Sequence, residues 1–430
     1  MAWQRVDGRV WVGCALTCFS LLSSGCGSWS WSENSDEPLE TEEAEIDGFR
    51  LYSELGPSCR AAVALSPADL YGKLSFIPCS TGERGCEQLA WDGEVSWNPT
   101  GSRDMLQFSL QFGFASTGEL RRILITHQYP TRTTDGIPFE AVAYDAASGA
   151  PVAAFRNMGD ADIDDGSSFG PSRDCLLSVG ITSEAAVVLA RRSGSNDIVL
   201  NQAPLEQAAS ARTFSPLEAD DSVFRRAIFG SGKTAAFEQA DGKLFSLDTT
   251  SGEIEQSYGP ALRLWLSGIS GDDVLTRSAN PSVDGYYWFR GADSFERLSM
   301  SATHVLADAI RVVWLQDDGT ALKVHAGPRD TPEPSAAPVI ATLPRGNVLG
   351  ATLGEGVLAV HSATSALSTA GSDLNLVDLA TGTVQHRALT SSGSQLRLLA
   401  SSRGHAFMGQ SQYLLAQDTQ FEALVRYAVE

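Results

Sequence analysis

The sequence predicts an all-β fold, and two observations support that prediction. Beyond residue 100, short runs of alternating polar and apolar residues are separated by Gly, Asp and Ser. Long runs with helical periodicity are scarce.

The chain has 430 residues, 43% of them hydrophobic, so it holds ample material for a core and is neither fibrous nor generally disordered. This length fits two or three ordinary domains or one large repeat architecture.

Residues 1–26 have the features of an export signal. Arg5 and Arg9 give a basic start, and Val10 to Leu22 form an apolar run of 13 residues. That run suits the hydrophobic region of a signal peptide and is too short for an ordinary membrane span. No later apolar run is long enough to cross a bilayer.

The residues before Cys26 resemble the lipobox of bacterial lipoproteins. Small residues from Ser23 to Gly25 precede the cysteine, although the family prefers Leu at the position of Ser23 and here Leu22 lies one residue earlier. The resemblance implies that Cys26 is lipidated and becomes the first residue of the mature chain. Because Gly27 rather than Asp follows, it also implies the outer membrane, on its periplasmic or its surface side. An ordinary cleaved signal peptide and secretion are the alternative.

Residues 27–47 predict an extended acidic tether. This segment contains eight acidic residues and no Lys or Arg, and mutual repulsion keeps such a segment extended. The whole chain has 52 acidic and 31 basic residues, a formal net charge of −21. A phosphate backbone would be repelled by this charge, which excludes general nucleic-acid binding.

The four cysteines beyond Cys26 are Cys59, Cys79, Cys86 and Cys175. An even number in an exported chain predicts two disulfides, with three pairings possible. Cys79 and Cys86 flank a turn-like sequence, so a bridge between them is the simplest pairing and leaves Cys59 with Cys175. Their spacing lacks the clustering of a metal site.

A turn of the form D-x-x-[ST]-G recurs three times, each time between two predicted strands. It occupies 145–149, 248–252 and 378–382. The Asp can accept hydrogen bonds from backbone N–H groups across the turn, and the Gly supplies a positive φ. Together with weaker hairpins, including Ile198–Leu205, the turns recur about every 40–50 residues, the spacing of a four-stranded propeller blade. We therefore expect a β-propeller over 48–430, of about seven blades with six or eight possible; a stacked pair of β-sandwiches is the alternative.

At these turns the chain resembles the broad group of β-propellers with quinoprotein-like and WD40-like repeats, over 105–430. Quinoprotein repeats place a Trp shortly after the Gly, and Val152–Phe155, Ile254–Ser257 and Val384–Arg387 contain none. The resemblance therefore implies a fold and no quinone site. Residues 48–100 form a divergent first part, and strands from both termini are expected to share one blade, because this removes a free edge.

Four local patterns have competing interpretations. Phe229–Thr234 is similar to the end of a phosphate-binding loop, but Ala227 replaces its first Gly and strands follow, so a β-turn is expected. Ser66–Asp69 and Ser215–Glu218 are expected helix starts. Gly327–Pro338 has four prolines and is expected to be an exposed loop, either an insertion or a partner contact.

One acidic loop is the only candidate metal site. Asp160, Asp162 and Asp164 alternate before Gly166, as oxygen ligands do in calcium loops, but the EF-hand Gly and Glu positions hold Asp165 and Pro171. We favour a solvated loop, with weak calcium binding as the alternative. The six histidines have no metal or catalytic spacing, and we expect structural roles for them.

The sequence thus predicts a non-enzymatic envelope lipoprotein, whose propeller is a scaffold for another envelope protein or a ligand. It predicts no catalytic residues and no cofactor apart from the possible calcium. A hydrolase or lyase acting on polysaccharide or peptide from a central site is one alternative, and a calcium or small-ligand sensor is another.

Overall fold

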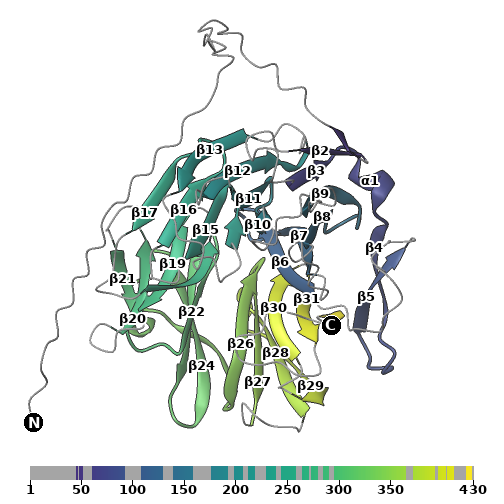
Figure 1. The fold of residues 1–430 in the computed structure, drawn as a ribbon. Coiled ribbons are helices and arrows are strands. Elements are labelled where there is room, and N and C mark those ends of the chain that lie inside the picture. Colours follow the sequence, from purple (N-terminus) through teal and green to yellow (C-terminus); the bar gives the residue numbers. More distant parts are fainter. Residues whose placement is uncertain are drawn as a thin grey trace, which may run out of the picture. The chain divides into compact units, whose positions relative to one another are not determined.

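The structure is a computed structural model, and Figure 1 shows its arrangement of strands. It describes residues 45–46, 48–51, 61–92, 108–128, 139–157, 176–191, 198–206, 212–217, 229–238, 244–257, 264–270, 273–278, 284–289, 295–364, 371–392, 396–402, 404–410 and 423–428. The strands in these residues pair into six sheets.

Four of the sheets contain four antiparallel strands in chain order, as expected for propeller blades. The first has β10 (Leu176–Ile181), β11 (Ala185–Arg191), β12 (Ile198–Pro204) and β13 (Arg212–Leu217). The second has β18 (Leu264–Ser270), β19 (Asp273–Ser278), β20 (Gly285–Phe289) and β21 (Phe295–Ser299). The third has β22 (His304–Ala307), β23 (Arg311–Asp317), β24 (Ala321–Pro328) and β25 (Val339–Pro344). The fourth has β26 (Asn347–Gly354), β27 (Val357–Ala363), β28 (Gly371–Asp378) and β29 (Val384–Ser392).

A fifth sheet joins both ends of the described chain. Its order is β30-β31-β32-β5-β4, from β30 (Leu396–Ser402), β31 (His405–Gln410), β32 (Ala423–Ala428), β5 (Cys86–Asp92) and β4 (Lys73–Pro78). Strand β5 pairs with the last strand, β32, and Figure 1 shows the β4–β5 hairpin beside the C-terminal strands. The expectation that strands from both termini share a blade is confirmed.

The remaining strands form one eleven-stranded sheet, which contains two four-stranded meanders. One has β6 (Phe108–Phe114), β7 (Leu120–Gln128), β8 (Phe139–Asp145) and β9 (Pro151–Asn157). The other has β14 (Phe229–Ser231), β15 (Thr234–Glu238), β16 (Leu244–Asp248) and β17 (Ile254–Ser257). A parallel pairing of β6 with β14 joins the two meanders. Beyond β9 the sheet continues through β3 (Ala61–Ala64), β2 (Phe49–Leu51) and β1 (Glu45–Ile46), so the last residues of the expected tether are part of a strand.

The expected number of about seven blades is therefore wrong. The described residues form five separate blades, and the β6–β14 pairing merges the other meanders into one sheet. The spacing of hairpins could not predict this, because the merging contact pairs only Gly113 with Gly230 and Phe114 with Ser231.

Apolar contacts between the sheets follow the order of the chain and return to its beginning. Sheet β18–β21 packs on β22–β25 through Trp288 and Trp314, which are both buried. At the other end of the series, Leu120 of the β6–β9 meander packs with Ala400 and Phe407 of the closing sheet. This cyclic packing of four-stranded units is the arrangement of a β-propeller.

Two local expectations are wrong, one is confirmed and one is confirmed in part. Ser215–Leu217 ends strand β13 instead of starting a helix, and an edge strand tolerates Pro216 because its N–H side needs no ladder bond. The expected Ile198–Leu205 hairpin is instead one strand, β12, paired along its length with β11. Helix α1 (Pro67–Leu70) does begin after Ser66. In the proline-rich segment, residues 329–338 form a loop with a short 3-10 helix, η3 (Pro334–Ala336), but Gly327 and Pro328 end strand β24, and Pro334 and Ala337 are buried rather than exposed. In the described part of the chain, no helix has the length and apolar character needed to cross a membrane.

Candidate functional site

The three recurring turns have the geometry that the sequence predicts. In each turn one carboxylate oxygen of the Asp accepts hydrogen bonds from the backbone N–H groups two and three residues later, at 2.7–3.2 Å. The glycines have φ of +69° at Gly149, +77° at Gly252 and +71° at Gly382. Such turns hold their backbone without help from distant residues.

In two of the turns the Asp also forms an ion pair. Asp145 accepts from Arg122 at 2.5 Å, and Asp248 accepts from Lys233 at 2.6 Å. Burial acts to raise the pKa of Asp145, but the hydrogen bonds from Ser148 and the charge of Arg122 outweigh it, so the pKa is lowered. Lys233 belongs to the segment that is similar to a phosphate-binding loop. Ser231 pairs with Thr234 across this segment, which confirms the expected β-turn.

These turns also reach the neighbouring sheet. A Cβ on Gly149 would lie 2.0 Å from the Leu74 carbonyl oxygen of β4, and one on Gly382 would lie 2.5 Å from the Ile340 carbonyl oxygen of β25. Only glycine fits so close to another backbone. Each of these two turns therefore contributes to local folding and to the contact between sheets.

The proline-rich loop also connects two neighbouring sheets, through an ion pair and an arginine stacked on a ring. Arg329 of this loop forms an ion pair with Asp273 of β19 at 2.6 Å, and its guanidinium lies 5.0 Å from the Trp288 ring centre. Sheet β22–β25 is thereby attached to β18–β21. The contact gives this expected exposed loop a structural role within the body.

The inner strands β6, β10, β14, β26 and β30 approach one another where they end, and we call this region the joined end. A Cβ on Gly113 would lie 2.4 Å from the Thr182 carbonyl oxygen, one on Gly230 1.9 Å from that of Ile181, and one on Gly354 1.8 Å from that of Ser401. Strand β6 pairs with β14 although the β10–β13 sheet packs against β6–β9. The sheets of β6 and β14 are separated by the β10–β13 sheet, so their strands can meet only where the inner strands converge.

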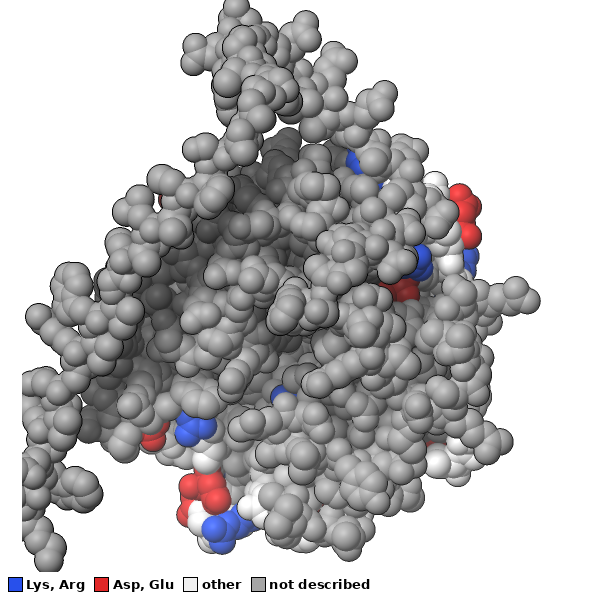
Figure 2. Space-filling view, viewed as in Figure 1, with Lys and Arg blue, Asp and Glu red and all other residues white. Residues whose placement is uncertain are grey.

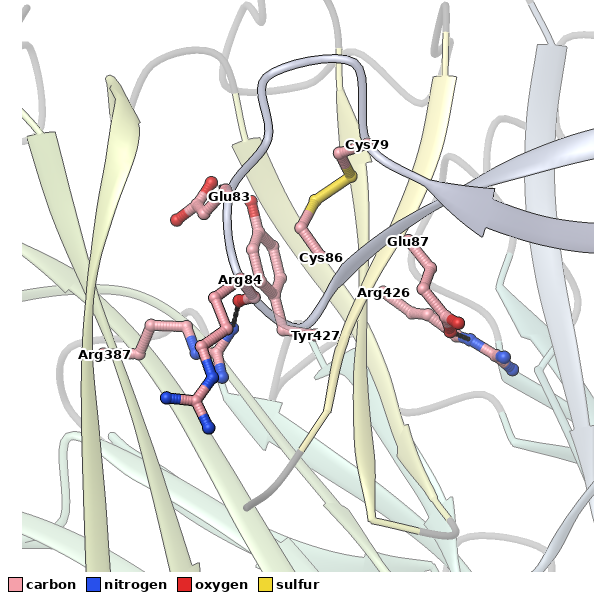
Figure 3. Close-up of a disulfide and its surroundings, with 8 residues drawn as sticks. All are labelled: Cys79, Glu83, Arg84, Cys86, Glu87, Arg387, Arg426 and Tyr427. Atoms are coloured by element: carbon pink, nitrogen blue, oxygen red, sulfur yellow. Dashed lines mark hydrogen bonds and ion pairs between the residues drawn. A yellow bond between two sulfur atoms is a disulfide. The ribbon is translucent and has the colours of Figure 1, made fainter.

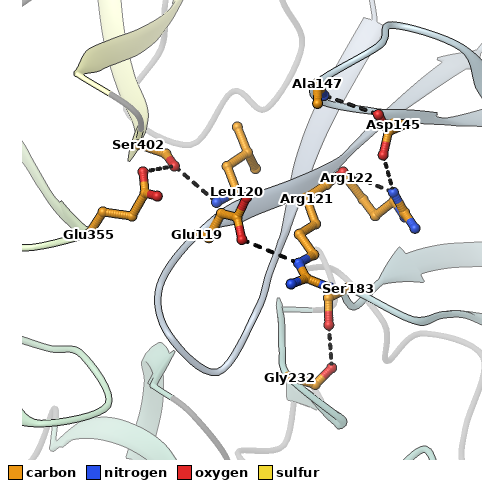
Figure 4. Close-up of polar contacts among 10 residues, drawn as sticks. All are labelled: Glu119, Leu120, Arg121, Arg122, Asp145, Ala147, Ser183, Gly232, Glu355 and Ser402. Carbon is orange, nitrogen blue, oxygen red and sulfur yellow. Dashed lines mark hydrogen bonds and ion pairs between the residues drawn. The ribbon is translucent and has the colours of Figure 1, made fainter.

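A second set of polar contacts crosses the joined end (Figure 4). Ser402 of β30 accepts a hydrogen bond from the Leu120 backbone N–H at 2.9 Å and donates to Glu355 at 2.7 Å. Glu355 has a φ of +48°, the only positive φ of a non-glycine residue in the part of the chain that the structure describes. Ser183 donates to the Gly232 carbonyl oxygen at 3.1 Å. The Gly232 N–H donates to the Phe114 carbonyl oxygen at 2.7 Å, so the turns that follow β6, β10, β14, β26 and β30 are connected.

The disulfide lies at the same end, in the closing sheet (Figure 3). Cys79 and Cys86 are bonded, which confirms this part of the expected pairing. Strand β5 pairs with β32 at only three positions, and an ion pair of 2.6 Å between Arg426 and Glu87 adds to them. Cys59 and Cys175 lie outside the described residues.

The candidate calcium ligands and the candidate lipidation site are not tested by the structure. Asp160, Asp162, Asp164 and Cys26 lie outside the described residues, so the calcium and lipidation expectations stay predictions. Among the residues that the structure does describe, no three His, Cys, Asp or Glu side chains are grouped as metal ligands.

One histidine has a clearly structural environment. His361 is fully buried, and its Nε2 lies 2.9 Å from the Ser372 hydroxyl. Burial lowers the pKa of His361 to about 4.

Charges of both signs are mixed on the visible surface. In the face shown in Figure 2, the described basic and acidic side chains lie in small mixed groups. Ion pairs between described residues include Arg345 with Asp317 and Lys323 with Asp318. That face carries no large patch of one sign among its described residues.

The strand order and the cyclic packing of the sheets define the fold, and solved structures with a partial likeness to the chain are known. Neither models of protein families nor curated proteins match the sequence. Among solved structures, an oligogalacturonate lyase in complex with manganese is 11% identical with a TM-score of 0.48, over 84% of this chain and 98% of the lyase. The β-propeller domain of the Trilobed protease from Pyrococcus furiosus is 9% identical, with a TM-score of 0.44 over 73% of this chain and 92% of that one. BamB from Moraxella catarrhalis is 15% identical, with a TM-score of 0.38 over 82% and 96%. The body is a β-propeller. Similarities of this size say nothing about its function.

Proposed function

We propose that the chain is a non-enzymatic propeller scaffold of the cell envelope, attached to the outer membrane by a lipid on Cys26, and that it binds another envelope protein through the joined end. The observation that supports this proposal is the connected, backbone-bonded surface formed by the turns after the inner strands. A surface that is already ordered loses little conformational entropy when a partner binds.

The three Asp turns follow the third strand of their four-stranded units, and each donates a backbone N–H to a carbonyl oxygen that follows the inner strand: Ala146 to Arg121, Thr249 to Lys233 and Leu379 to Gly356. Their tips therefore border this surface and give it its chemical character. Ala147, Thr250 and Ala380 occupy equivalent positions in the turns, and all three are exposed. Their side chains are small, so a partner can approach the backbone of the turns closely. A large charged residue at these positions would block the approach without removing the Asp hydrogen bonds that hold the turns.

The test is crosslinking of the protein in its native membrane, followed by capture and mass spectrometry. The variants Ala147→Arg, Thr250→Arg and Ala380→Arg should each reduce recovery of one stoichiometric envelope partner. Ser301→Arg, in the exposed turn between β21 and β22, is the matched control and should leave recovery unchanged. Equal recovery from all four variants, or recovery of the protein alone, would contradict the proposal.

The anchor is tested separately. Cys26→Ser should release the protein from the membrane fraction and remove the added mass of the lipid from the mature chain. A mature chain without lipid mass in the unmutated protein would refute the anchor and leave binding at the joined end as a separate question.

A further inference from the structure

The sheets β18–β21 and β22–β25 face each other across a layer of aromatic residues, and an arginine lies against this layer at each end. Arg329 stacks on Trp288, and Arg277 stacks on Tyr286 with 5.5 Å between guanidinium carbon and ring centre. Both aromatic residues belong to β20 and are buried in the same cluster. The two arginines are therefore comparable in their surroundings.

Their polar contacts differ. Arg329 is bonded to the Asp273 carboxylate and to the Ala309 carbonyl oxygen. Arg277 is exposed, and no carboxylate in the described part of the chain accepts a hydrogen bond from it. The guanidinium of Arg277 stacks on the ring, and none of its N–H groups donates a hydrogen bond to a residue that the structure describes. A guanidinium held on a ring in this way presents a fork of donors that matches a carboxylate.

Strand register explains why Arg277 is held in place. Arg277 of β19 pairs with Tyr286 of β20, which in turn pairs with Ser299 of β21, so one row crosses the sheet. The Tyr286 hydroxyl donates to the Thr303 carbonyl oxygen at 3.0 Å, which fixes the ring against the connection to β22. The ring that carries the guanidinium is therefore rigid.

Two further polar atoms near this row have no partner. The Ser299 hydroxyl is buried, with 1% of the residue exposed, and makes no hydrogen bond. His304, the first residue of β22, has a buried Nδ1 without a partner. Burial first, and then the charge of Arg277, lower the pKa of His304, so both favour the neutral ring. Buried polar atoms are normally paired, and exceptions occur at binding sites.

We propose that Arg277, stacked on Tyr286 and accompanied by His304, binds the carboxylate of a small ligand at the end of the β18–β21 sheet opposite the joined end. The two parallel N–H donors of an arginine match a carboxylate, and stacking pre-orients them. Such a carboxylate can come from the C-terminus of a peptide or from an acidic sugar. The site is independent of the proposed partner surface, because it lies at the other end of the strands.

Among the described residues, Asp284 carries a negative charge that acts on Tyr286 and would oppose an anion. This exposed residue lies close enough to Tyr286 to raise the pKa of its hydroxyl, after the larger effect of burial, and makes no ion pair with Arg277. Replacing Asp284 with Asn should therefore strengthen binding of a carboxylate. The sign of this effect separates charge recognition from apolar contact.

The experiment is calorimetric titration of the full chain with two carboxylic acids, each compared with a neutral analogue. Triglycine is compared with its C-terminal amide, and glucuronate with glucose. At least one of the two acids should bind in the millimolar range, and its neutral analogue should not. Binding of the peptide acid alone assigns a peptide carboxylate, and binding of glucuronate alone assigns an acidic sugar.

Variants decide whether Arg277 is responsible. Arg277→Ala should weaken binding of the acid by at least about tenfold, because a charge-assisted pair is lost. The control is Arg297→Ala, an exposed arginine of the same sheet that pairs in register with Tyr287 rather than Tyr286. Unchanged melting temperatures would show that both variants fold.

Three results would overturn the proposal. They are no binding of either acid, equal binding of the amide or glucose, and equal affinity of Arg277→Ala and the unmutated chain. None of them bears on the joined end, whose test uses substitutions in the turns. Failure of the carboxylate site and failure of the proposed function are therefore distinguishable.

Discussion

The two ends of the inner strands satisfy their polar groups in different ways. At the joined end, backbone groups of several sheets meet directly, and Ser402, Ser183 and Glu355 connect the turns. At the opposite end, His361 and Ser299 are buried with atoms that have no partner, and Arg277 has no acidic partner among the described residues. Arg122 at the joined end also has a buried Nε without a partner, so the ends differ in the close approach of backbones and in the exposed Arg277 rather than in buried unpartnered atoms.

The two stacked arginines show this difference within one interface. Arg329 has an acidic partner and links two sheets near the joined end, whereas Arg277 stacks in the same way without one. Similar local packing can therefore serve stability in one place and recognition in another. Substitutions at the two ends should accordingly differ in their effects on stability.

The largest effect is expected from adding one methyl group at the joined end. In Gly230→Ala the new Cβ would lie 1.9 Å from the Ile181 carbonyl oxygen, so two backbones must move apart. We expect a loss of about 3 kcal/mol or more in the free energy of unfolding, measured by urea denaturation. The control is Gly350→Ala, where the nearest atom is Leu398 Cβ at 3.4 Å and the loss should stay below about 1 kcal/mol. Equal losses would contradict the difference between the ends.

The second-largest effect is a dependence of the free energy of unfolding on pH, which we expect from His361. The pKa of His361 is about 4 in the folded chain and about 6.5 when unfolded, so the unfolded state takes up the proton first. Stability due to His361 is therefore complete above pH 6.5 and decreases as the pH falls towards 4, by up to about 3 kcal/mol. The charge of Asp373 opposes this shift, because it favours the protonated ring.

Paired variants isolate the contribution of His361. His361→Gln should remove most of the loss of stability between pH 7 and pH 4.5, measured by urea denaturation at both values. His386→Gln, in which the exposed ring that contacts Asp373 is replaced, should keep it. A pH dependence unchanged by His361→Gln would refute this account.

The sequence could predict what depends on neighbouring residues. The D-x-x-[ST]-G turns, the Cys79–Cys86 bridge and helix α1 all involve residues less than ten positions apart, and all three are confirmed. Local chemistry fixes each of them, because the partners are close whatever the rest of the chain does. The sharing of one sheet by both termini was also predictable, from the need to remove a free edge.

Features that need register between distant strands could not be predicted. Gly113 and Gly230 meet through a parallel pairing of two meanders, and neither glycine is distinguished in the sequence from those of ordinary turns. The row of Arg277, Tyr286 and Ser299 depends on two antiparallel registers, and the β20–β21 register shifts between Tyr286 and Tyr287. Pro216 led to a wrong helix because the pattern does not reveal that β13 is an edge strand.

A smaller effect is expected from the disulfide. Cys79→Ala combined with Cys86→Ala should lower the free energy of unfolding by about 2 kcal/mol, because a short loop is no longer closed in the unfolded chain. The measurement is urea denaturation in a Cys59→Ser/Cys175→Ser background, which removes the other two cysteines of the body. In that background a reducing agent should destabilise the chain with Cys79 and Cys86 by the same amount and leave the Ala variant unchanged. A reductant effect that survives in the Ala variant would contradict this origin.

The smallest effect is expected from a single turn at the joined end. Asp145→Ala removes the acceptor for the Ala147 and Ser148 N–H groups and the ion pair with Arg122. All these groups are partly solvated, so we expect a loss of only about 1 kcal/mol in the free energy of unfolding. Glu184→Ala, at an exposed position of the neighbouring turn, should change stability by less than about 0.5 kcal/mol. If Asp145→Ala instead cost as much as Gly230→Ala, the stability of the joined end would come from its turns rather than from the close approach of its strands.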